Sequence, residues 1–294
     1  MSAFKVLHRN SHDLPLILRA LIKRFYAKSK WTLFRNEVNS SKSNNCVILV
    51  NGPSLKKDIL MAVKKIEQKK SDVMCVNYTA LTDIFFQVKP NLYALADPMF
   101  WRTDVTQEFV DKNNILFDTF KSAKWKIKFL IPEEGVEMVR KRLGSGSLHS
   151  CVPIPVNVAP IKNMNTLLSM LDKMVCTPIY GNVLILSLYY SVMSQYKDIS
   201  VYGADFDVFK QLQTDQITNH VFAGGAHFYD KSFSPEPVKY LNRSNKMMHV
   251  RLGQEQNAFF QIYTLALLAK KRKISLKNRS SFSLIDSLDR GFDE

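Results

Sequence analysis

Residues 46–55 read CVILVNGPSL, an apolar run that ends at Asn51-Gly52 and is followed by a proline and a serine. Such a run predicts a strand that is buried on both faces, and the pattern of Lys56–Lys69 predicts a helix directly after it. Gly52 permits close approach of a ligand to the backbone, and Ser54 is a suitable cap for that helix, whose first amides attract anions. The loop is neither a Walker loop nor GxGxxG, so those cofactor sites are not predicted.

The same rhythm of apolar strands and intervening helices continues along the chain. A second strong helix is predicted over Gly181–Tyr196. The pattern predicts an α/β fold, a single Rossmann-like domain with a mostly parallel sheet, helices on both faces, an inserted lid and an N-terminal basic amphipathic helix. The further strands predicted are Asp72–Val76, Leu92–Ala96, Lys126–Ile131, Asp198–Tyr202 and Lys273–Leu276.

Short polar residues follow four of these strands, namely Asn51, Asn77, Asp97 and Asp205. Parallel sheets bind ligands at the carboxyl ends of their strands, so these side chains are candidates for nucleotide contact. Asn and Asp also serve as ordinary turn and cap residues, and that alternative stays open for each position.

Two further patterns carry possible chemistry at the ends of elements. Thr177–Asn182 opens the apolar helix, where Thr177 or Asn182 is a candidate cap and free amides are able to hold a ligand. Asp205-Phe206-Asp207 is a DxD pattern, and its carboxylates suit Mg²⁺ or Mn²⁺. We expect no metal at this site and keep Asp205 and Asp207 as the alternative.

Residues 205–255 break the α/β rhythm, with Gly224-Gly225, two prolines and three histidines, and we interpret them as an active-site lid. Within it, His227 is a candidate general base for a sugar hydroxyl. Tyr229 and Tyr240 are candidate donors to a departing phosphate. A histidine in a loop is also often a plain surface residue.

Charge is distributed unevenly along the chain. The 294 residues carry a formal charge of +15, and residues 1–43 hold nine Lys or Arg against Asp13 and Glu37. Residues 14–27 follow the spacing of an amphipathic helix, which predicts either contact with an anionic membrane or packing on the domain or a sister subunit. The resulting division is 1–43 basic segment, 44–204 nucleotide-binding α/β domain, 205–255 lid, and 256–294 helix, strand and tail completing the domain.

Composition also bears on the compartment. The four cysteines form no CxxC pair, which indicates free thiols in a reducing cytoplasm. The chain lacks a run of about 18 apolar residues and a signal-peptide pattern. We therefore expect a cytoplasmic protein on the inner face of the cell membrane, with no nucleic-acid partner and with homo-oligomerisation open.

The ordered set of motifs resembles the bacterial sialyltransferase family (glycosyltransferase family 42). The matching stretches are VILVNGPSL (47–55), VNYTAL (76–81), YALADP (93–98) and DISVYGADF (198–206). The NGPSL loop, the GAD segment and HFYD (227–230) also resemble polysaccharide-cluster proteins related to the archaeal hydroxymethylpterin pyrophosphokinases. Asp97, Tyr180 and Asp207 depart from the sialyltransferase pattern, which has Asn, Ser and Tyr there.

The resemblance implies an inverting glycosyltransferase that uses a CMP-activated sugar without a metal. The donor would be a nonulosonic acid of sialic, pseudaminic, legionaminic or Kdo type, and the acceptor a bacterial surface glycan or a lipid-linked glycan. It implies nucleotide contacts by Asn51, Gly52, Ser54, Asn77 and Asp97, donor-sugar contacts by Gly181, Asn182 and Asp205, and catalysis by His227 with Tyr229 and Tyr240. The alternatives are a metal-dependent transferase of nucleotide-diphosphate sugars, a pyrophosphokinase, and a non-enzymatic basic adaptor.

Overall fold

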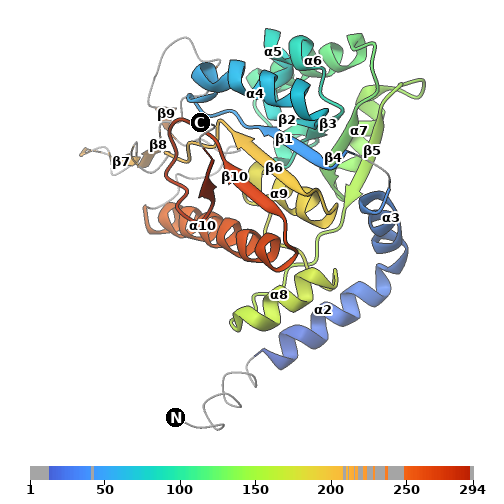
Figure 1. Ribbon diagram of the computed structural model, residues 1–294, viewed down its shortest axis with the longest axis vertical. Helices are drawn as coiled ribbons and strands as arrows, with labels where there is room; N and C mark the ends of the chain where they lie inside the picture. The colour runs from blue at the N-terminus through green and yellow to red at the C-terminus, as the bar shows by residue number, and fades with distance from the viewer. Residues whose placement is uncertain are drawn as a thin grey trace.

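An eight-stranded parallel sheet forms the centre of the protein in a computed structural model (Figure 1). The structure describes residues 13–40, 43–207, 210, 212–214, 216–217, 221–223, 228, 236–237 and 248–291. The strand order is β11-β10-β6-β1-β2-β3-β4-β5, and every neighbouring pair is parallel. The strands are β1 (Asn45–Leu49), β2 (Asp72–Val76), β3 (Leu92–Ala94), β4 (Lys128–Pro132), β5 (Ser150–Ile154), β6 (Asp198–Tyr202), β10 (Ser275–Asn278) and β11 (Asp289–Arg290).

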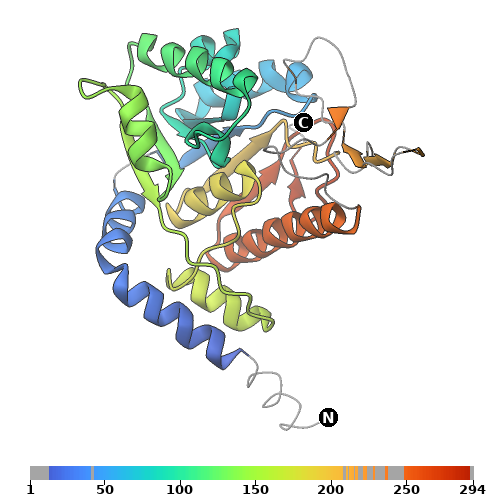
Figure 2. The same ribbon diagram turned by 180° about the vertical axis from the view of Figure 1, so that it is seen from behind.

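Helices cover both faces of this sheet, as the sequence predicts (Figures 1 and 2). Alternate side chains of one strand enter opposite cores, because successive residues of a strand point to opposite faces. Val47 and Leu49 of β1 join one core, whereas Cys46 and Ile48 join the other. The first core is covered by α4 (Leu55–Lys69), α5 (Asp83–Val88), α6 (Gln107–Ser122) and α7 (Val136–Leu143), and the second by α3 (Lys28–Val38), α8 (Met164–Asp172), α9 (Val183–Met193) and α10 (Met248–Lys271).

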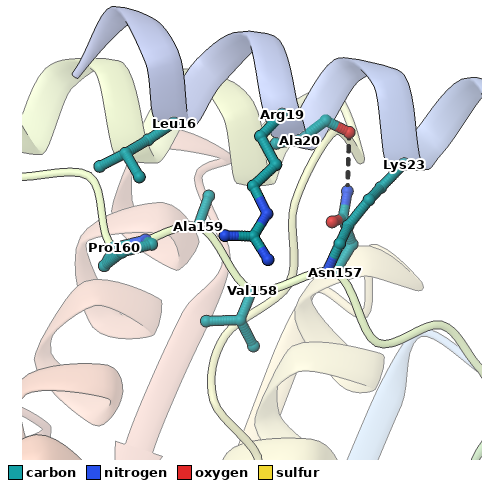
Figure 3. A pocket seen from close by; sticks show the side chains of 8 residues that line it. All are labelled: Leu16, Arg19, Ala20, Lys23, Asn157, Val158, Ala159 and Pro160. Carbon is teal, nitrogen blue, oxygen red and sulfur yellow. Dashed lines mark hydrogen bonds between the residues drawn. The ribbon is translucent and has the colours of Figure 1, made fainter.

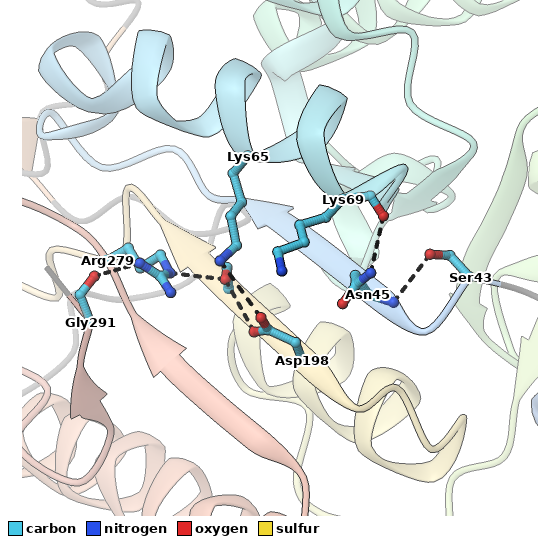
Figure 4. A network of polar contacts seen from close by, with 8 residues as sticks. Ser43, Asn45, Lys65, Lys69, Asp198, Arg279 and Gly291 are labelled. Carbon is cyan, nitrogen blue, oxygen red and sulfur yellow. Dashed lines mark hydrogen bonds and ion pairs between the residues drawn. The ribbon is translucent and has the colours of Figure 1, made fainter. Parts of the chain in front are cut away.

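Polar contacts tie the amino half of the sheet to α4 (Figure 4). Lys65 of α4 lies 3.6 Å from the carboxylate of Asp198, the first residue of β6. Arg279 follows β10, and its guanidinium donates to Ser200 Oγ (3.0 Å) and to the carbonyl of Gly291 (2.8 Å). Arg279 thus links β6 to Gly291, the residue after β11, which is an edge strand of only two residues.

The N-terminal segment is two helices, α2 (Leu14–Tyr26) and α3. α3 belongs to the core of the domain, because Trp31, Phe34 and Val38 are buried against the sheet layer. Phe34 also stacks on Tyr189 of α9, with ring centroids 5.8 Å apart. The expected boundary near residue 43 therefore does not separate an independent segment, because the apolar side of α3 is part of the main core.

The described part of the 205–255 segment contains a small antiparallel sheet of β7 (Leu212–Thr214), β8 (Val221–Ala223) and β9 (Glu236–Pro237). α10 begins at Met248, so the predicted lid ends earlier than residue 255. No helix within the described ranges is long and apolar enough to cross a membrane. The four cysteines carry free thiols, and three of them, Cys46, Cys75 and Cys176, are buried.

Candidate active site

The topological switch point of the sheet lies between β1 and β6. From β1 the chain builds the sheet outward through β2, β3, β4 and β5, and it then returns to the other side of β1 with β6, β10 and β11. Loops that leave the carboxyl ends of two such strands turn to opposite faces, which opens the usual ligand position of doubly wound folds. The loops concerned are the Asn51–Ser54 and Gly203–Asp205 segments, the two that carry the strongest motifs.

The two loops are held backbone against backbone by a pair of glycines. The Gly52 amide donates to the Gly203 carbonyl at 2.8 Å. A Cβ on Gly52 would lie 2.5 Å from that carbonyl oxygen, and a Cβ on Gly203 would lie 2.4 Å from the Val50 carbonyl oxygen. Gly203 also has φ +72°, in the left-handed region that favours glycine. Gly52 therefore permits the close contact between the loops that follow β1 and β6, and its predicted approach to a ligand stays a prediction.

The side chain of Asp205 forms a second link between the same two loops. Asp205 Oδ2 accepts from the Ser54 backbone amide at 2.8 Å, and Asp205 Oδ1 accepts a short hydrogen bond from Ser54 Oγ. Both residues are buried, with exposed fractions of 3% for Asp205 and 5% for Ser54. Burial raises the pKa of the Asp205 carboxyl above its usual value, the two Ser54 bonds partly oppose that rise, and the charges of Asp207 and Asp58 add to it. We call this contact the Ser54–Asp205 latch.

The latch changes what the start of α4 offers to a ligand. Ser54 makes no side-chain cap bond, contrary to its predicted role, because its hydroxyl is directed to Asp205. Its amide is directed to the same carboxylate, and the Leu55 and Lys56 amides donate to the carbonyls of Gly52 and Pro53 (3.1 and 3.2 Å). The Asp205 carboxylate thus takes up the Ser54 amide and hydroxyl at the start of α4, where we predicted that backbone amides attract an anion.

The loop after β6 is also fixed by a segment that the sequence did not single out. Ser280 Oγ accepts from the Ala204 amide (2.9 Å), Ser283 Oγ donates to the Ala204 carbonyl (2.5 Å), and the Leu284 amide donates to the Asp205 carbonyl (2.8 Å). The segment 279–284, which follows β10, lies far from this loop in sequence, so only the sheet order shows their proximity.

Asn51 is buried and bonded on both sides at the end of β1. Its Oδ1 accepts from Thr79 Oγ1 at 2.6 Å, and its Nδ2 lies 3.5 Å from the Val76 carbonyl oxygen. Its backbone carbonyl accepts from the Phe228 amide at 3.0 Å. Phe228 is the one described residue of the HFYD motif, and this bond brings that point of the 205–255 segment to the carboxyl end of β1.

Asn77, the residue after β2, differs from Asn51 in the hydrogen bonding of its side-chain oxygen within the described part of the chain. It follows β2 with φ +49°, a conformation that asparagine tolerates. Its Oδ1 is buried, and no hydrogen-bond partner is present among the residues that the structure describes. Tyr93 fixes the backbone here, donating to the Asn77 carbonyl (2.7 Å) and accepting from the Ala80 amide (2.8 Å). A buried amide oxygen without a partner is costly, and a bound ligand or water would offset that cost.

Asp97 and Asn182 are both helix caps in the structure. Asp97 follows β3, and its Oδ1 accepts from the Met99 amide at 3.0 Å, which starts the 3₁₀ helix η2 (Pro98–Phe100). Asn182 Oδ1 accepts from the Leu184 amide at 2.8 Å and caps α9. Thr177, the other candidate cap for that helix, instead accepts from the Asn157 amide.

Gly181 is exposed, and open space surrounds the position that a Cβ would take. α9 runs back to the amino end of β6, so its start, with Gly181 and Asn182, lies toward the carboxyl edge of the sheet.

The predicted catalytic residues His227, Tyr229 and Tyr240 lie outside the described residues. Asp207, the second carboxylate of the DxD pattern, is described and half-buried. In the described part of the chain no group of three or more His, Cys, Asp or Glu is placed to hold a metal ion. Both carboxylate oxygens of Asp205 accept hydrogen bonds from Ser54, and the metal alternative at Asp205 and Asp207 stays untested.

Comparison with known proteins gives no family for this chain. No model of a known protein family matches it, and no curated protein matches it either.

Proposed function

We propose that this protein is a nucleotide-sugar-dependent glycosyltransferase whose donor site lies at the carboxyl edge of the sheet. Support comes from the switch point between β1 and β6 and from the polar residues that end β1, β2, β3 and β6. The donor class, a CMP-activated nonulosonic acid, and the acceptor, a bacterial surface glycan, follow from the motif resemblance. We expect the reaction to invert the anomeric carbon.

The residues at this edge divide into two groups in our proposal. Asn51, Gly52, Ser54 and Asp205 build the frame, since their polar or backbone groups already bond one another or their neighbours. Asn77 is the first candidate for direct nucleotide contact, because its buried Oδ1 has no partner in the described residues. An amide oxygen there suits a donor such as the exocyclic amine of cytosine or a ribose hydroxyl.

The observation that carries the proposal is the bond from the Phe228 amide to the Asn51 carbonyl. It supports a location for the HFYD motif beside the strand ends where a donor would bind. In the proposed step His227 takes the proton of the acceptor hydroxyl. That oxygen then bonds to the anomeric carbon, and the bond from that carbon to the phosphate oxygen breaks, with its electron pair leaving on CMP. Tyr229 and Tyr240 are the proposed donors to the departing phosphate.

The test is release of CMP from a panel of CMP-sialic acid, CMP-pseudaminic acid, CMP-legionaminic acid and CMP-Kdo, with and without acceptor. His227→Ala should lower turnover by about 10²–10⁴-fold, as for loss of a general base. His249→Ala is the matched control, because His249 is an exposed histidine at the start of α10. Equal turnover of wild type and His227→Ala would remove His227 from the mechanism.

A second assay separates the metal-dependent alternative. Our assignment of Asp205 to the frame predicts that Asp205→Asn keeps most turnover and that EDTA has little effect. Loss of activity in both experiments would favour a metal-dependent transferase or a pyrophosphokinase.

A further inference from the structure

An apolar stripe runs along the outer side of α2. Its members recur at helical spacing, so they lie on one side of the helix. They are strongly exposed, from 45% for Leu21 to 74% for Phe25, and Tyr26 beside them is 83% exposed. The stripe consists of Leu14, Leu18, Leu21, Ile22 and Phe25. Single exposed apolar residues are common, but a continuous row on one helix indicates a contact surface.

The opposite side of α2 is fixed to the domain, which holds the stripe outward. Ala20 is buried, and its carbonyl accepts from Asn157 Nδ2 at 3.0 Å (Figure 3). Asp13, just before the helix, accepts from the amides of Lys162 and Asn163 at 3.1 and 2.9 Å. Both ribbon views place α2 at one end of the molecule, beside α8 and away from α4 (Figures 1 and 2).

A pocket of about 140 Å³ lies between α2 and residues 157–160 (Figure 3). It is smaller than the roughly 300–1,000 Å³ of typical small-molecule sites, so it does not compete with the sheet edge as a donor site.

The exposed charges of α2 and α3 that have no acidic partner among the described residues share one sign, and two of them, Arg19 and Lys23, lie beside the pocket in Figure 3. Within 13–38 the acidic residues are Asp13, buried and bonded as above, and Glu37, which bonds Lys128 and Tyr190. Lys30 pairs with Glu133 at 2.6 Å. The other exposed charged side chains of α2 and α3 are all cationic, namely Arg19, Lys23, Lys28 and Arg35.

We propose that α2 binds the surface of an anionic lipid bilayer, with the apolar stripe in the interface and the cations among the headgroups. An exposed apolar stripe on a helix whose exposed charges are all cationic, with exposed aromatic rings at one end, is the composition of interfacial helices. The 13 residues of α2 make it about 20 Å long, too short to span the roughly 30 Å hydrocarbon layer. Self-association through this face would bring two cationic surfaces together, which charge repulsion opposes.

The test is co-sedimentation of the full chain with vesicles of phosphatidylcholine alone or with about a third phosphatidylglycerol. These vesicles contain no sugar donor or acceptor, so the result is independent of the proposed enzymatic function. We expect binding to the anionic vesicles, weak binding to the neutral ones, and loss of binding as salt rises.

Leu18→Ser/Phe25→Ser and Lys23→Glu/Lys28→Glu should each weaken binding at least about tenfold. The matched controls lie on α4: Leu60→Ser removes a leucine that is 76% exposed, and Lys57→Glu/Lys64→Glu reverses two exposed lysines. Both controls should bind vesicles as wild type does.

The proposal would be overturned if the wild-type protein does not bind the anionic vesicles, or if Leu18→Ser/Phe25→Ser binds them as tightly as wild type does. Light scattering of the same samples without lipid tests the alternative that a second copy of the chain covers the stripe. A wild-type dimer that Leu18→Ser/Phe25→Ser converts to a monomer would assign the stripe to a second copy of the chain and would also overturn the proposal.

Discussion

Replacement of Asp205 tests whether the Ser54–Asp205 latch is a structural device. Asp205→Ala leaves the Ser54 amide buried without its acceptor, and an unsatisfied buried donor costs about 1–3 kcal/mol. The lost bond to the Ser54 hydroxyl and the vacated volume add to this, whereas removal of a buried charge partly offsets it. We expect a net loss of about 2–3 kcal/mol in the free energy of unfolding.

Asp205→Asn keeps the shape and changes only the charge. The amide oxygen can accept from the Ser54 backbone amide, and the amide nitrogen can donate to the Ser54 hydroxyl, which both donates and accepts. Both contacts persist and no charge is buried. We therefore expect Asp205→Asn to lose less than about 1 kcal/mol at pH 7, clearly less than Asp205→Ala.

The pH dependence has a definite sign. The folded-state pKa of Asp205 is raised above its ordinary value of 3.8, so the folded protein binds more protons than the unfolded chain at pH values just above 3.8. The contribution of Asp205 to stability is therefore fully present below about pH 3.8 and is lost as pH rises through the folded pKa. The stability deficit of Asp205→Asn relative to wild type should shrink as pH rises from 4 to 7.

Urea unfolding at pH 4, 5, 6 and 7, followed by circular dichroism, measures these differences. Asp118→Asn is the control, since that carboxylate is 73% exposed and its pair with Lys121 is a surface contact. An Asp205→Ala protein as stable as wild type would refute the latch. An Asp205→Asn deficit that grows with pH would show that the Ser54 bonds, and not burial, dominate the carboxyl group.

Three further substitutions test other parts of the fold by urea unfolding. Gly203→Ala should lower the free energy of unfolding by at least about 3 kcal/mol. The reason is that φ +72° strains alanine and that its Cβ would lie 2.4 Å from the Val50 carbonyl oxygen. A loss below about 1 kcal/mol would contradict the packing of the two loops. Asn157→Ala should lower the free energy of unfolding by about 2–3 kcal/mol and speed amide hydrogen exchange in α2, because it removes the bond to the Ala20 carbonyl. Unchanged exchange would show that other contacts hold α2. Asn182→Ala should cost about 1 kcal/mol as the loss of a cap of α9, and no loss would remove that cap.

The central sheet follows directly from the sequence because its strands are buried on both faces. The predictions for β2 and β6 agree at both ends with the structure, and β1 differs by one residue at each end. β5 was missed because Pro153 interrupts a mixed run. A proline in the middle of a strand is found mainly on edge strands, and β5 is one edge of this sheet. The two-residue strand β11 is too short to leave a pattern.

Helix boundaries near polar residues were harder to predict. α3 was missed because its buried residues Trp31, Phe34 and Val38 stand among Lys, Ser, Thr, Arg, Asn and Glu, so that the stretch reads as mainly polar. The early start of α10 was missed because the stretch from Met248 contains Arg251, Gly253 and Gln254 and has no clear apolar face.

The positions of the strand-end residues could be predicted, but their partners could not. Asn51 and Asp205 follow their strands as the sequence indicates. Their bonds to Thr79 and Ser54 join residues 28 and 151 positions apart, and such pairs depend on loop geometry that one sequence does not contain. For the same reason only the structure shows that Oδ1 of Asn77 has no hydrogen-bond partner among the described residues.

The most direct test of the account is CMP binding without metal, measured by calorimetry and by thermal shift against CDP, UDP and GDP. Asn77→Gly removes the amide while keeping φ +49° free of strain, and Lys89→Gly repeats that change at a left-handed position (φ +45°) between α5 and β3. We predict that CMP binds preferentially and that Asn77→Gly weakens it roughly tenfold while Lys89→Gly does not, since a lost hydrogen bond is worth about 0.5–1.5 kcal/mol. No stabilisation by any nucleotide, or equal CMP affinity of Asn77→Gly and wild type, would contradict the account.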